Sequence, residues 1–347
     1  MRIMKLLIGA TVLTAMLFWS AGCDREVVNA PDDTQASYAG CFTCHGEDGY
    51  LLAARGEWEN SIHASGNNVD YTNRGGTDCT QCHNHQGFLE YVATGEVTAP
   101  YDQVSAIHCF TCHAPHSRGD LTLRIDDPYI LANDDVFDFG SANLCANCHH
   151  SRYSSDNIVD NIEVSQYWGP HHGPQGDLVA GSNGYEYDGY FYGNTGHGNV
   201  GMGNACIGCH MGNPSTHVGY RVGGHSFNMV DEESDATLVG VCQECHPEAE
   251  NFDYDGIQTE VEGLLEELDD LLVAAGLIDG SGYPISGTIA DKNMAGAVFN
   301  YKLVEEDRSL GIHNPAYVID LLESSIEYME NMAGKSAVGK IAVLSAH

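Results

Sequence analysis

The C-terminal third of the chain shows the clearest alternation of apolar and polar positions. Apolar residues recur every three or four positions over residues 261–272, acidic residues fill the opposite face, and Gly276 follows. This spacing predicts an amphipathic helix that ends at the glycine. A second helical pattern covers residues 291–306, and a third begins at Asn314, an expected N-cap, with Pro315 at the first helical position. The three patterns predict a helical bundle.

The N-terminus carries a different pattern. Arg2 and Lys5 precede an apolar run and the small residues Ser20, Ala21 and Gly22. This arrangement predicts a secretory signal peptide over residues 1–22, and the apolar run is shorter than a membrane-spanning helix requires. The segment that ends at Cys23 resembles the lipobox of bacterial lipoproteins. That resemblance implies lipidation of Cys23 and a lipid-anchored tether over residues 23–40.

The charge balance narrows the range of partners. The 347 residues include 49 Asp and Glu against 14 Lys and Arg, for a net charge of −35, and removal of residues 1–22 would deepen it to −37. Such a chain lacks the basic face that nucleic acid binding requires. Hydrophobic residues make up 43% of the chain, which is too much for an intrinsically disordered protein. The acidic surface predicts redox partner proteins with basic patches.

Six Cys-x-x-Cys-His motifs account for twelve of the thirteen cysteines, and the thirteenth is Cys23. The spacing is typical of c-type haem attachment, in which two thiols bind one haem covalently and the adjoining histidine is the proximal iron ligand. A disulfide framework or zinc sites would not need a histidine after every pair. The sequence therefore predicts six covalently bound haem c groups. Their cysteines are Cys41, Cys44, Cys79, Cys82, Cys109, Cys112, Cys145, Cys148, Cys206, Cys209, Cys242 and Cys245, and their proximal ligands are His45, His83, His113, His149, His210 and His246.

The motif spacing also predicts the architecture. Six haems over about 200 residues leave little chain to insulate them, so the haems form the core of residues 41–250 and lie near one another. We expect a mainly α fold with extensive irregular loops in this hexahaem-binding region, and a C-terminal helical region over 251–347. In the glycine-rich stretch 181–193, five aromatic residues are expected to pack on haem: Tyr185, Tyr187, Tyr190, Phe191 and Tyr192.

Twelve further histidines remain for the sixth coordination position of six irons. This surplus favours bis-histidine ligation over methionine. We expect distal ligands among His63, His85, His116, His172, His197, His225 and His313, with one of His171 and His172 sufficient for its site. His85 and His116 would bridge to neighbouring haems. His108 and His150 rank lower, and His217 and His347 rank lowest. His313 would connect the helical region to the haem region.

Three segments carry a resemblance to known proteins. Cys-Phe-Thr-Cys-His-Ala-Pro-His at 109–116, Trp-Gly-Pro-His-His-Gly-Pro-Gln-Gly at 168–176, and residues 295–315 resemble exported multihaem cytochromes c of anaerobic respiratory bacteria. The last segment is also similar to the C-terminal helical part of multihaem nitrite and tetrathionate reductases, and this likeness implies that His313 ligates a haem. The chain lacks the Cys-x-x-Cys-Lys motif that the pentahaem nitrite reductases use for catalysis.

We therefore expect a non-enzymatic electron carrier that passes electrons along six bis-histidine haems in anaerobic or extracellular respiration. The alternatives are an oxyanion reductase of the nitrite or tetrathionate type and a subunit of a polymerising cytochrome filament. The expected location is the periplasm, outer membrane or cell surface, with the chain held to a membrane by lipid. Other multihaem cytochromes are possible partners.

Overall fold

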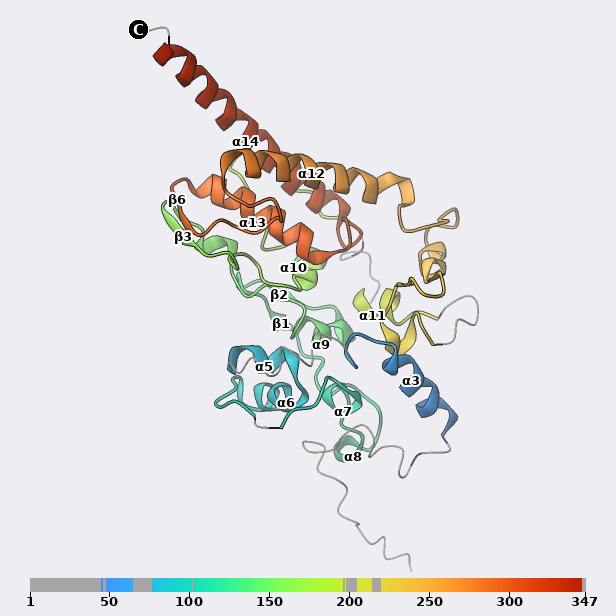
Figure 1. The fold of residues 1–347 in the computed structure, drawn as a ribbon. Helices are drawn as coiled ribbons and strands as arrows, with labels where there is room; N and C mark the ends of the chain where they lie inside the picture. The colour runs from blue at the N-terminus through green and yellow to red at the C-terminus, as the bar shows by residue number, and fades with distance from the viewer. Residues whose placement is uncertain are drawn as a thin grey trace, which may run out of the picture.

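The computed structural model describes residues 45, 48–64, 77–101, 103–195, 197, 205–213 and 220–344. The predicted signal peptide, the tether and the residues Cys23, Cys41 and Cys44 lie outside this part of the chain. In Figure 1, long helices pack together at one end of the molecule, and short helices joined by irregular segments form the rest. The fold is mainly α with extensive loops, as the sequence predicted.

The helical end consists of α12 (Ile257–Ala275), α13 (Lys292–Asp307) and α14 (Pro315–Leu344), which contact one another in all three combinations. Gly276 caps α12 with a left-handed conformation, and the Asp291 side chain accepts hydrogen bonds from the first turn of α13. Apolar residues at helical spacing are fully buried between these helices, among them Leu268, Leu272, Phe299, Leu321 and Leu322. All three predicted helices are confirmed.

The start of α14 differs from the prediction in one respect. The side chain of Asn314 accepts a hydrogen bond from the backbone of Thr195 and donates to the carbonyl of Leu178. The hydroxyl of Thr195 instead accepts the hydrogen bond from the backbone N–H of Ala316. Asn314 directly precedes the first residue of α14 and its carbonyl accepts from the Val318 N–H, so it holds the expected N-cap position. The side-chain capping bond comes instead from Thr195, which lies 119 positions before Asn314.

The haem-motif region contains only short elements. Its helices are α3 (Gly49–Glu59), α5 (Thr77–His83), α6 (His85–Thr94), α7 (Cys109–Cys112), α8 (Pro115–Arg118), α9 (Asn143–Ala146), α10 (Gln175–Ala180) and α11 (Ala205–His210). Its 3-10 turns are η2 (Gly140–Ala142), η3 (Ser155–Asn157), η4 (Gly224–Ser226), η5 (Val239–Glu244) and η6 (Tyr254–Gly256). Sparse regular structure is what a region built around cofactors was expected to show.

Three antiparallel strand pairs complete the described structure. They are β1 (Tyr129–Ile130) with β2 (Val136–Phe137), β3 (Ile162–Val164) with β6 (Gly287–Ile289), and β4 (Val230–Asp231) with β5 (Ala236–Thr237). In the pair that joins the two regions, Ile162 lies opposite Ile289. The largest buried apolar cluster extends from this pair through the long helices, whereas the clusters among the haem motifs are small. The protein's own core is thus concentrated at the helical end.

The tyrosine-rich stretch 181–193 packs Tyr185, Tyr187 and Tyr192 against the long helices, so the expected packing of these three on haem was wrong, whereas that of Tyr190 and Phe191 stays a prediction. Asn300 of α13 accepts a hydrogen bond from the backbone N–H of Tyr185 and donates one to its carbonyl. The ring of Tyr187 stacks on that of Tyr328 of α14 at 5.4 Å, and Tyr192 donates to the hydroxyl of Ser324. Of the remaining two aromatic residues, Tyr190 is exposed and Phe191 is 87% exposed. The buried Asn300 and the aromatic surface of α14 explain this docking.

Candidate haem-binding sites

The five haem motifs inside the described residues share one local geometry. Each begins on a short helix or 3-10 turn, which places two cysteines three residues apart on one face. In three of them the N–H of the histidine donates to the carbonyl of the first cysteine, as in His113 to Cys109 at 2.9 Å. None of the ten cysteines of these motifs forms a disulfide within the described residues. One face of a helical turn therefore offers two thiols and an imidazole, as covalent haem attachment requires.

Each of four proximal histidines faces a second imidazole from a distant part of the chain. The ring centroids are 6.1 Å apart for His63 and His149, 6.4 Å for His113 and His225, 6.2 Å for His197 and His246, and 6.3 Å for His210 and His313. A ring nitrogen binds a transition metal at about 2 Å and lies about 1 Å from the ring centroid, so two imidazoles on opposite sides of one iron have centroids about 6 Å apart. The residues fit a bis-histidine haem iron.

Hydrogen bonds at the Nδ1 atoms orient five of these eight imidazoles. The partners are oxygen acceptors: the Gln175 amide for His149 (3.1 Å), the Thr122 carbonyl for His113 (3.4 Å), the Phe227 carbonyl for His210 (2.9 Å), and the carboxylates of Glu57 for His225 (3.4 Å) and Asp307 for His313 (2.6 Å). An acceptor at Nδ1 fixes the proton on that atom and leaves the Nε2 lone pair for a metal.

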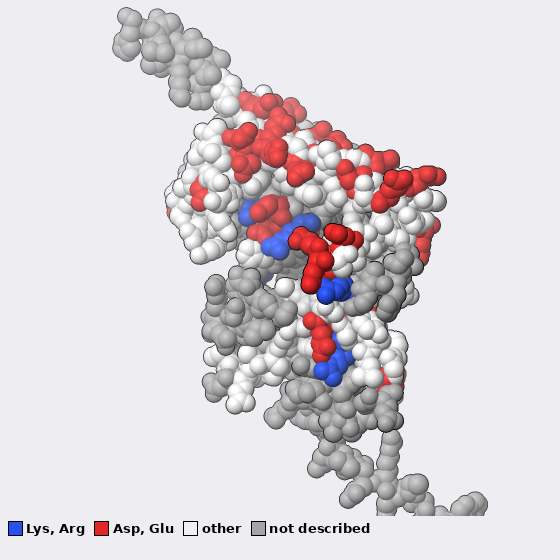
Figure 2. Space-filling view, turned by 45° about the vertical axis from the view of Figure 1, so that its right-hand side comes forward, with Lys and Arg blue, Asp and Glu red and all other residues white. Residues whose placement is uncertain are grey.

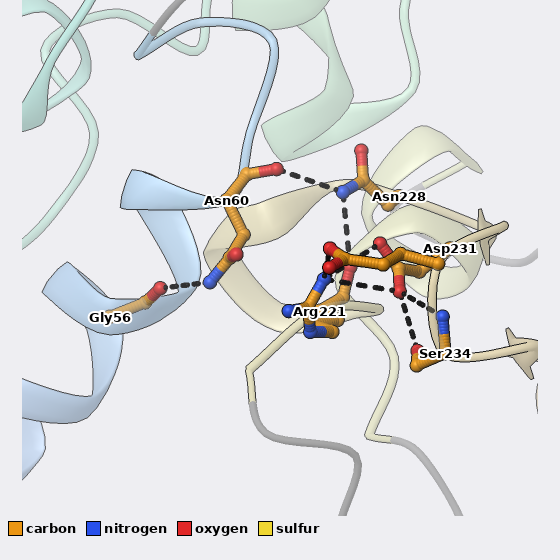
Figure 3. Close-up of polar contacts among 7 residues, drawn as sticks. Gly56, Asn60, Arg221, Asn228, Asp231 and Ser234 are labelled. Atoms are coloured by element: carbon orange, nitrogen blue, oxygen red, sulfur yellow. Dashed lines mark hydrogen bonds and ion pairs between the residues drawn. The ribbon is translucent and has the colours of Figure 1, made fainter.

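Helix α3 holds two of the distal histidines in place. Glu57 of α3 accepts hydrogen bonds from both the backbone N–H and the ring of His225. Gly224 makes this approach possible, since a Cβ at that position would lie 2.3 Å from the Glu57 carboxylate. Figure 3 shows a second connection, in which Asn228 donates to the carbonyl of Asn60 at the end of α3. His63 follows four residues after α3 ends.

The segment that carries His225 is also braced internally. Arg221 forms ion pairs with Asp231 at 3.4 Å and Glu233 at 2.6 Å, and Asn228 donates to the carbonyl of Arg221 (Figure 3). Phe227 lies within this segment, with its ring 5.1 Å from His63 and 6.2 Å from His225, while its carbonyl accepts from His210. Three of the four imidazole pairs therefore meet around Phe227.

The remaining sequence-predicted ligands lie in varied surroundings. His83 interacts electrostatically with both His171 and His172, so either could complete its site. His172 also forms an ion pair with Glu306 at 2.7 Å. His45 and His116 are exposed, and His217 and His347 lie outside the described residues. The ligand roles of His45, His83, His116 and His172, like those of the histidines in the four pairs, stay predictions.

Two buried histidines near the motifs have rings occupied by other contacts. His150 has both ring nitrogens in hydrogen bonds, to the Ser151 carbonyl and the Tyr129 hydroxyl, which agrees with its low rank. The ring of His85 lies 4.2 Å from that of His108, too close for an iron between them, and its Nδ1 contacts the Thr111 hydroxyl. A role for His85 at another haem stays a prediction.

Burial shifts the protonation of several imidazoles. Desolvation, with a smaller contribution from His149, lowers the pKa of His63 to about 4, so this ring is neutral at pH 7 and can bind a metal. Burial lowers the pKa of His313, but the charge and hydrogen bond of Asp307 outweigh it and raise the net value. Burial raises the pKa of Glu306, whereas His172 and Lys302 bring it down to about 2. The carboxylate of Glu306 is therefore ionised beside His172.

Thiols of different motifs come into contact. Cys82 of the second motif lies beside the fourth, where its thiol donates to the Asn147 carbonyl at 3.8 Å and interacts with Cys148, and Cys145 of the fourth motif interacts with Cys206 of the fifth. Cys209 of the fifth motif interacts electrostatically with both cysteines of the sixth. The fourth motif thus lies between the second and the fifth, and the described attachment points form a connected series.

No protein-family model matches the chain. It is 22% identical to the C-type polyheme cytochrome OmcB of Geobacter sulfurreducens over 76% of its length, and 24% identical to OmcC of the same organism over 93%. The chain is similar to multihaem c-type cytochromes. It spans about half the length of these curated relatives, since the matches cover 45% of OmcB and 49% of OmcC.

Two solved structures share the fold. The outer cell wall cytochrome OcwA matches 79% of this chain and 49% of its own with a TM-score of 0.52 and 21% identity. The undecaheme cytochrome from the S-layer of Carboxydothermus ferrireducens matches 86% of this chain and 46% of its own with a TM-score of 0.50 and 20% identity. The fold is thus one seen in multihaem cytochromes. Among the helices of the described residues, none has the length and hydropathy of a membrane-spanning segment.

The residues that orient the imidazoles were not found from the sequence. Gln175, Glu57 and Asp307 each contact a ring nitrogen of a histidine, and two of those histidines are at least 26 positions away. Only Asp307 offered a local signal, since it lies six positions before His313, but a carboxylate near a histidine is common in so acidic a chain.

Proposed function

We propose that this chain is an exported electron-transfer cytochrome with six covalently bound haem c groups, each iron held by two histidines. The observation that carries the proposal is the set of four imidazole pairs, each combining a motif histidine with a distant one at about 6 Å. When bound, the haems supply reversible one-electron chemistry. Two histidines would hold each iron, which would favour electron transfer over binding of a substrate.

The contacts between motifs support transfer along a series of haems. Because each motif thiol is an attachment point, the proximity of Cys82 to the fourth motif and of Cys145 to Cys206 favours close neighbouring haems. The negative charge of the surface indicates which kind of partner protein would bind. Figure 2 shows acidic side chains gathered over the helical part of one face, and the exposed acids of α12 are Glu260, Glu262, Glu266, Glu267 and Asp270. Basic-patched redox proteins would approach such a surface fastest.

The location belongs to the same proposal. The N-terminal pattern favours export, and lipidation of Cys23 would hold the chain to a membrane. The printed names of two structural neighbours place those proteins in a cell wall and an S-layer, which is compatible with a role in extracellular respiration. Labelling with a radioactive fatty acid tests the anchor: label on the wild type and none on Cys23→Ser is expected, and label on both would contradict lipidation at Cys23.

The test of the haem sites combines mass with spectroscopy. We expect an intact mass with six haems after expression in a host that attaches haem c, and low-spin ferric signals in electron paramagnetic resonance. His63→Gln and His225→Gln should each convert one haem to high spin, because glutamine removes one axial imidazole. His150→Gln is the matched control, since both nitrogens of His150 already bind protein groups.

Three outcomes would contradict the proposal. They are a mass with fewer than six haems, unchanged low-spin signals in both ligand variants, or a high-spin signal in the wild type with sustained nitrite or tetrathionate reduction. The last outcome would favour an oxyanion reductase.

A further inference from the structure

The buried carboxylate of Asp307 binds one imidazole of the proposed haem sites directly. Its side chain is 1% exposed and lies 2.6 Å from Nδ1 of His313, whose ring faces that of His210. The second carboxylate oxygen accepts a hydrogen bond from the hydroxyl of Ser309. Asp307 is the last residue of α13, where the negative end of the helix dipole disfavours a carboxylate. The helix therefore holds a buried negative charge against this ring despite an electrostatic cost.

The other oriented imidazoles have weaker acceptors. His149 meets the neutral amide of Gln175, and His113 and His210 meet backbone carbonyls. Glu57 is a carboxylate as well, but it lies 3.4 Å from the His225 ring and is 25% exposed, so water screens its charge. Within the described pairs, the short bond to a fully buried carboxylate is specific to His313.

The neutral acceptor Gln175 and the charged acceptor Asp307 lie together at the C-terminal end of α13. Gln175 accepts from the His149 ring through its Oε1 atom and donates through Nε2 to the carbonyls of Glu306 and Asp307. The C-terminal end of α13 therefore supports two neighbouring sites at once. It places a charged acceptor on the His210–His313 site and a neutral one on the His63–His149 site.

A carboxylate that accepts the Nδ1 proton makes an imidazole a stronger donor at Nε2, and its charge stabilises ferric over ferrous iron. Resting on the proposed function, we propose that Asp307 is a positioning residue that lowers the reduction potential of the haem held by His210 and His313 below that of the haem held by His63 and His149. One electron would then pass from the haem of the His210–His313 site, which is oxidised, to the haem of the His63–His149 site, which is reduced. Neither site loses a ligand or a proton.

The experiment is a redox titration of the full haem-loaded protein, followed by low-temperature electron paramagnetic resonance. The signal that His313→Gln removes identifies the haem concerned. In Asp307→Asn this signal should titrate at a higher potential, with an equilibrium constant for reduction changed on the order of tenfold, or about 59 mV for one electron. Glu305→Gln removes the same charge from the exposed face of the same helix and should leave the titration unchanged.

A second variant serves if Asp307→Asn does not fold. Ser309→Ala keeps the carboxylate but removes the hydroxyl, which donates to Asp307 and accepts from the backbone N–H of His313 at 3.3 Å. The carboxylate then has one donor fewer, so its bond to the His313 ring strengthens and the potential of the same haem should fall. A purely structural role would not move the two variants in opposite directions.

The possible failures are distinguishable. If the His313-dependent signal keeps its potential in both variants, or if Glu305→Gln shifts it as much as Asp307→Asn, the role of Asp307 is refuted and the haem ligation stands. If His313→Gln leaves every low-spin signal intact, the ligation itself is wrong.

Discussion

Asp177 provides a test of the packing that supports the haem sites. Its carboxylate is fully buried on α10 and accepts hydrogen bonds from the backbone N–H of Ser151 at 2.6 Å and from the amide of Asn183 at 3.0 Å. Ser151 lies two residues after His149, and Asn183 begins the tyrosine-rich stretch. We predict that Asp177→Asn changes the pH dependence of stability in a defined direction.

The magnitude follows from the shifted pKa. Burial raises the pKa of Asp177 from 3.8 to about 6, although the hydrogen bonds from Ser151 and Asn183 partly oppose the shift. The folded protein therefore binds the proton more tightly than the unfolded chain, and this contribution to stability is full below pH 3.8 and lost as the pH rises through 6. The full pKa difference between the folded and unfolded states corresponds to about 3 kcal/mol in the free energy of unfolding. About 1.4 kcal/mol of this contribution is lost between about pH 5 and pH 7.5.

The asparagine variant removes this titration but adds a constant penalty. Its NH₂ group must face either the Ser151 N–H or the Asn183 amide, both of which are donors, at a cost of about 1–3 kcal/mol at any pH. Measured by guanidinium unfolding, the stability advantage of the wild type over Asp177→Asn should shrink by about 1.4 kcal/mol from about pH 5 to pH 7.5.

The control and the refuting result are well defined. Asp156→Asn removes the same charge from an exposed position and is the control for the loss of one carboxylate. A difference between the wild type and Asp177→Asn that stays constant from pH 5 to pH 7.5 would show that Asp177 is ionised throughout and that burial does not raise its pKa.

Two further predictions concern the helical region and the surface. Asn300→Leu leaves the backbone N–H and carbonyl of Tyr185 without their side-chain partner, whereas the Ser325 hydroxyl keeps its bond to the Leu321 carbonyl, so the free energy of unfolding should fall by about 3 kcal/mol. Asn293→Leu on the same helix removes one part-buried bond, from the Tyr185 hydroxyl, and should lower the free energy of unfolding by about 1 kcal/mol; equal effects in denaturant unfolding would contradict the argument. The association rate with a basic redox protein, measured by stopped flow, should fall on the order of tenfold as the Debye length shrinks from about 30 Å to about 3 Å, and less steeply for Glu262→Gln with Glu266→Gln; a rate independent of salt would argue against steering by the acidic surface.

Local patterns allowed part of this structure to be predicted. The apolar spacing of residues 261–272 and the stop at Gly276 gave α12, and the spacing of each Cys-x-x-Cys-His motif predicts its attachment geometry. The distal histidines could only be narrowed to a set, because the pairing of His113 with His225 depends on how the chain folds across 112 positions. The tyrosine-rich stretch failed for the same reason, since nothing near Tyr185 in the sequence indicates the buried amide of Asn300.

The position of His313, a predicted distal ligand, connects the helical region to the haem motifs. The position of a motif histidine is set by its own Cys-x-x-Cys-His motif. The position of a predicted distal histidine is set by the tertiary structure around it. The side chain of Asn314 donates to the carbonyl of Leu178 and to the amide oxygen of Asn194. His313 directly precedes Asn314, and its ring is hydrogen-bonded to Asp307. The buried core among α12, α13 and α14 is larger than the clusters around the motifs, so it is the more rigid support. Through Asn314 and Asp307 this core holds the His313 ring in place opposite His210.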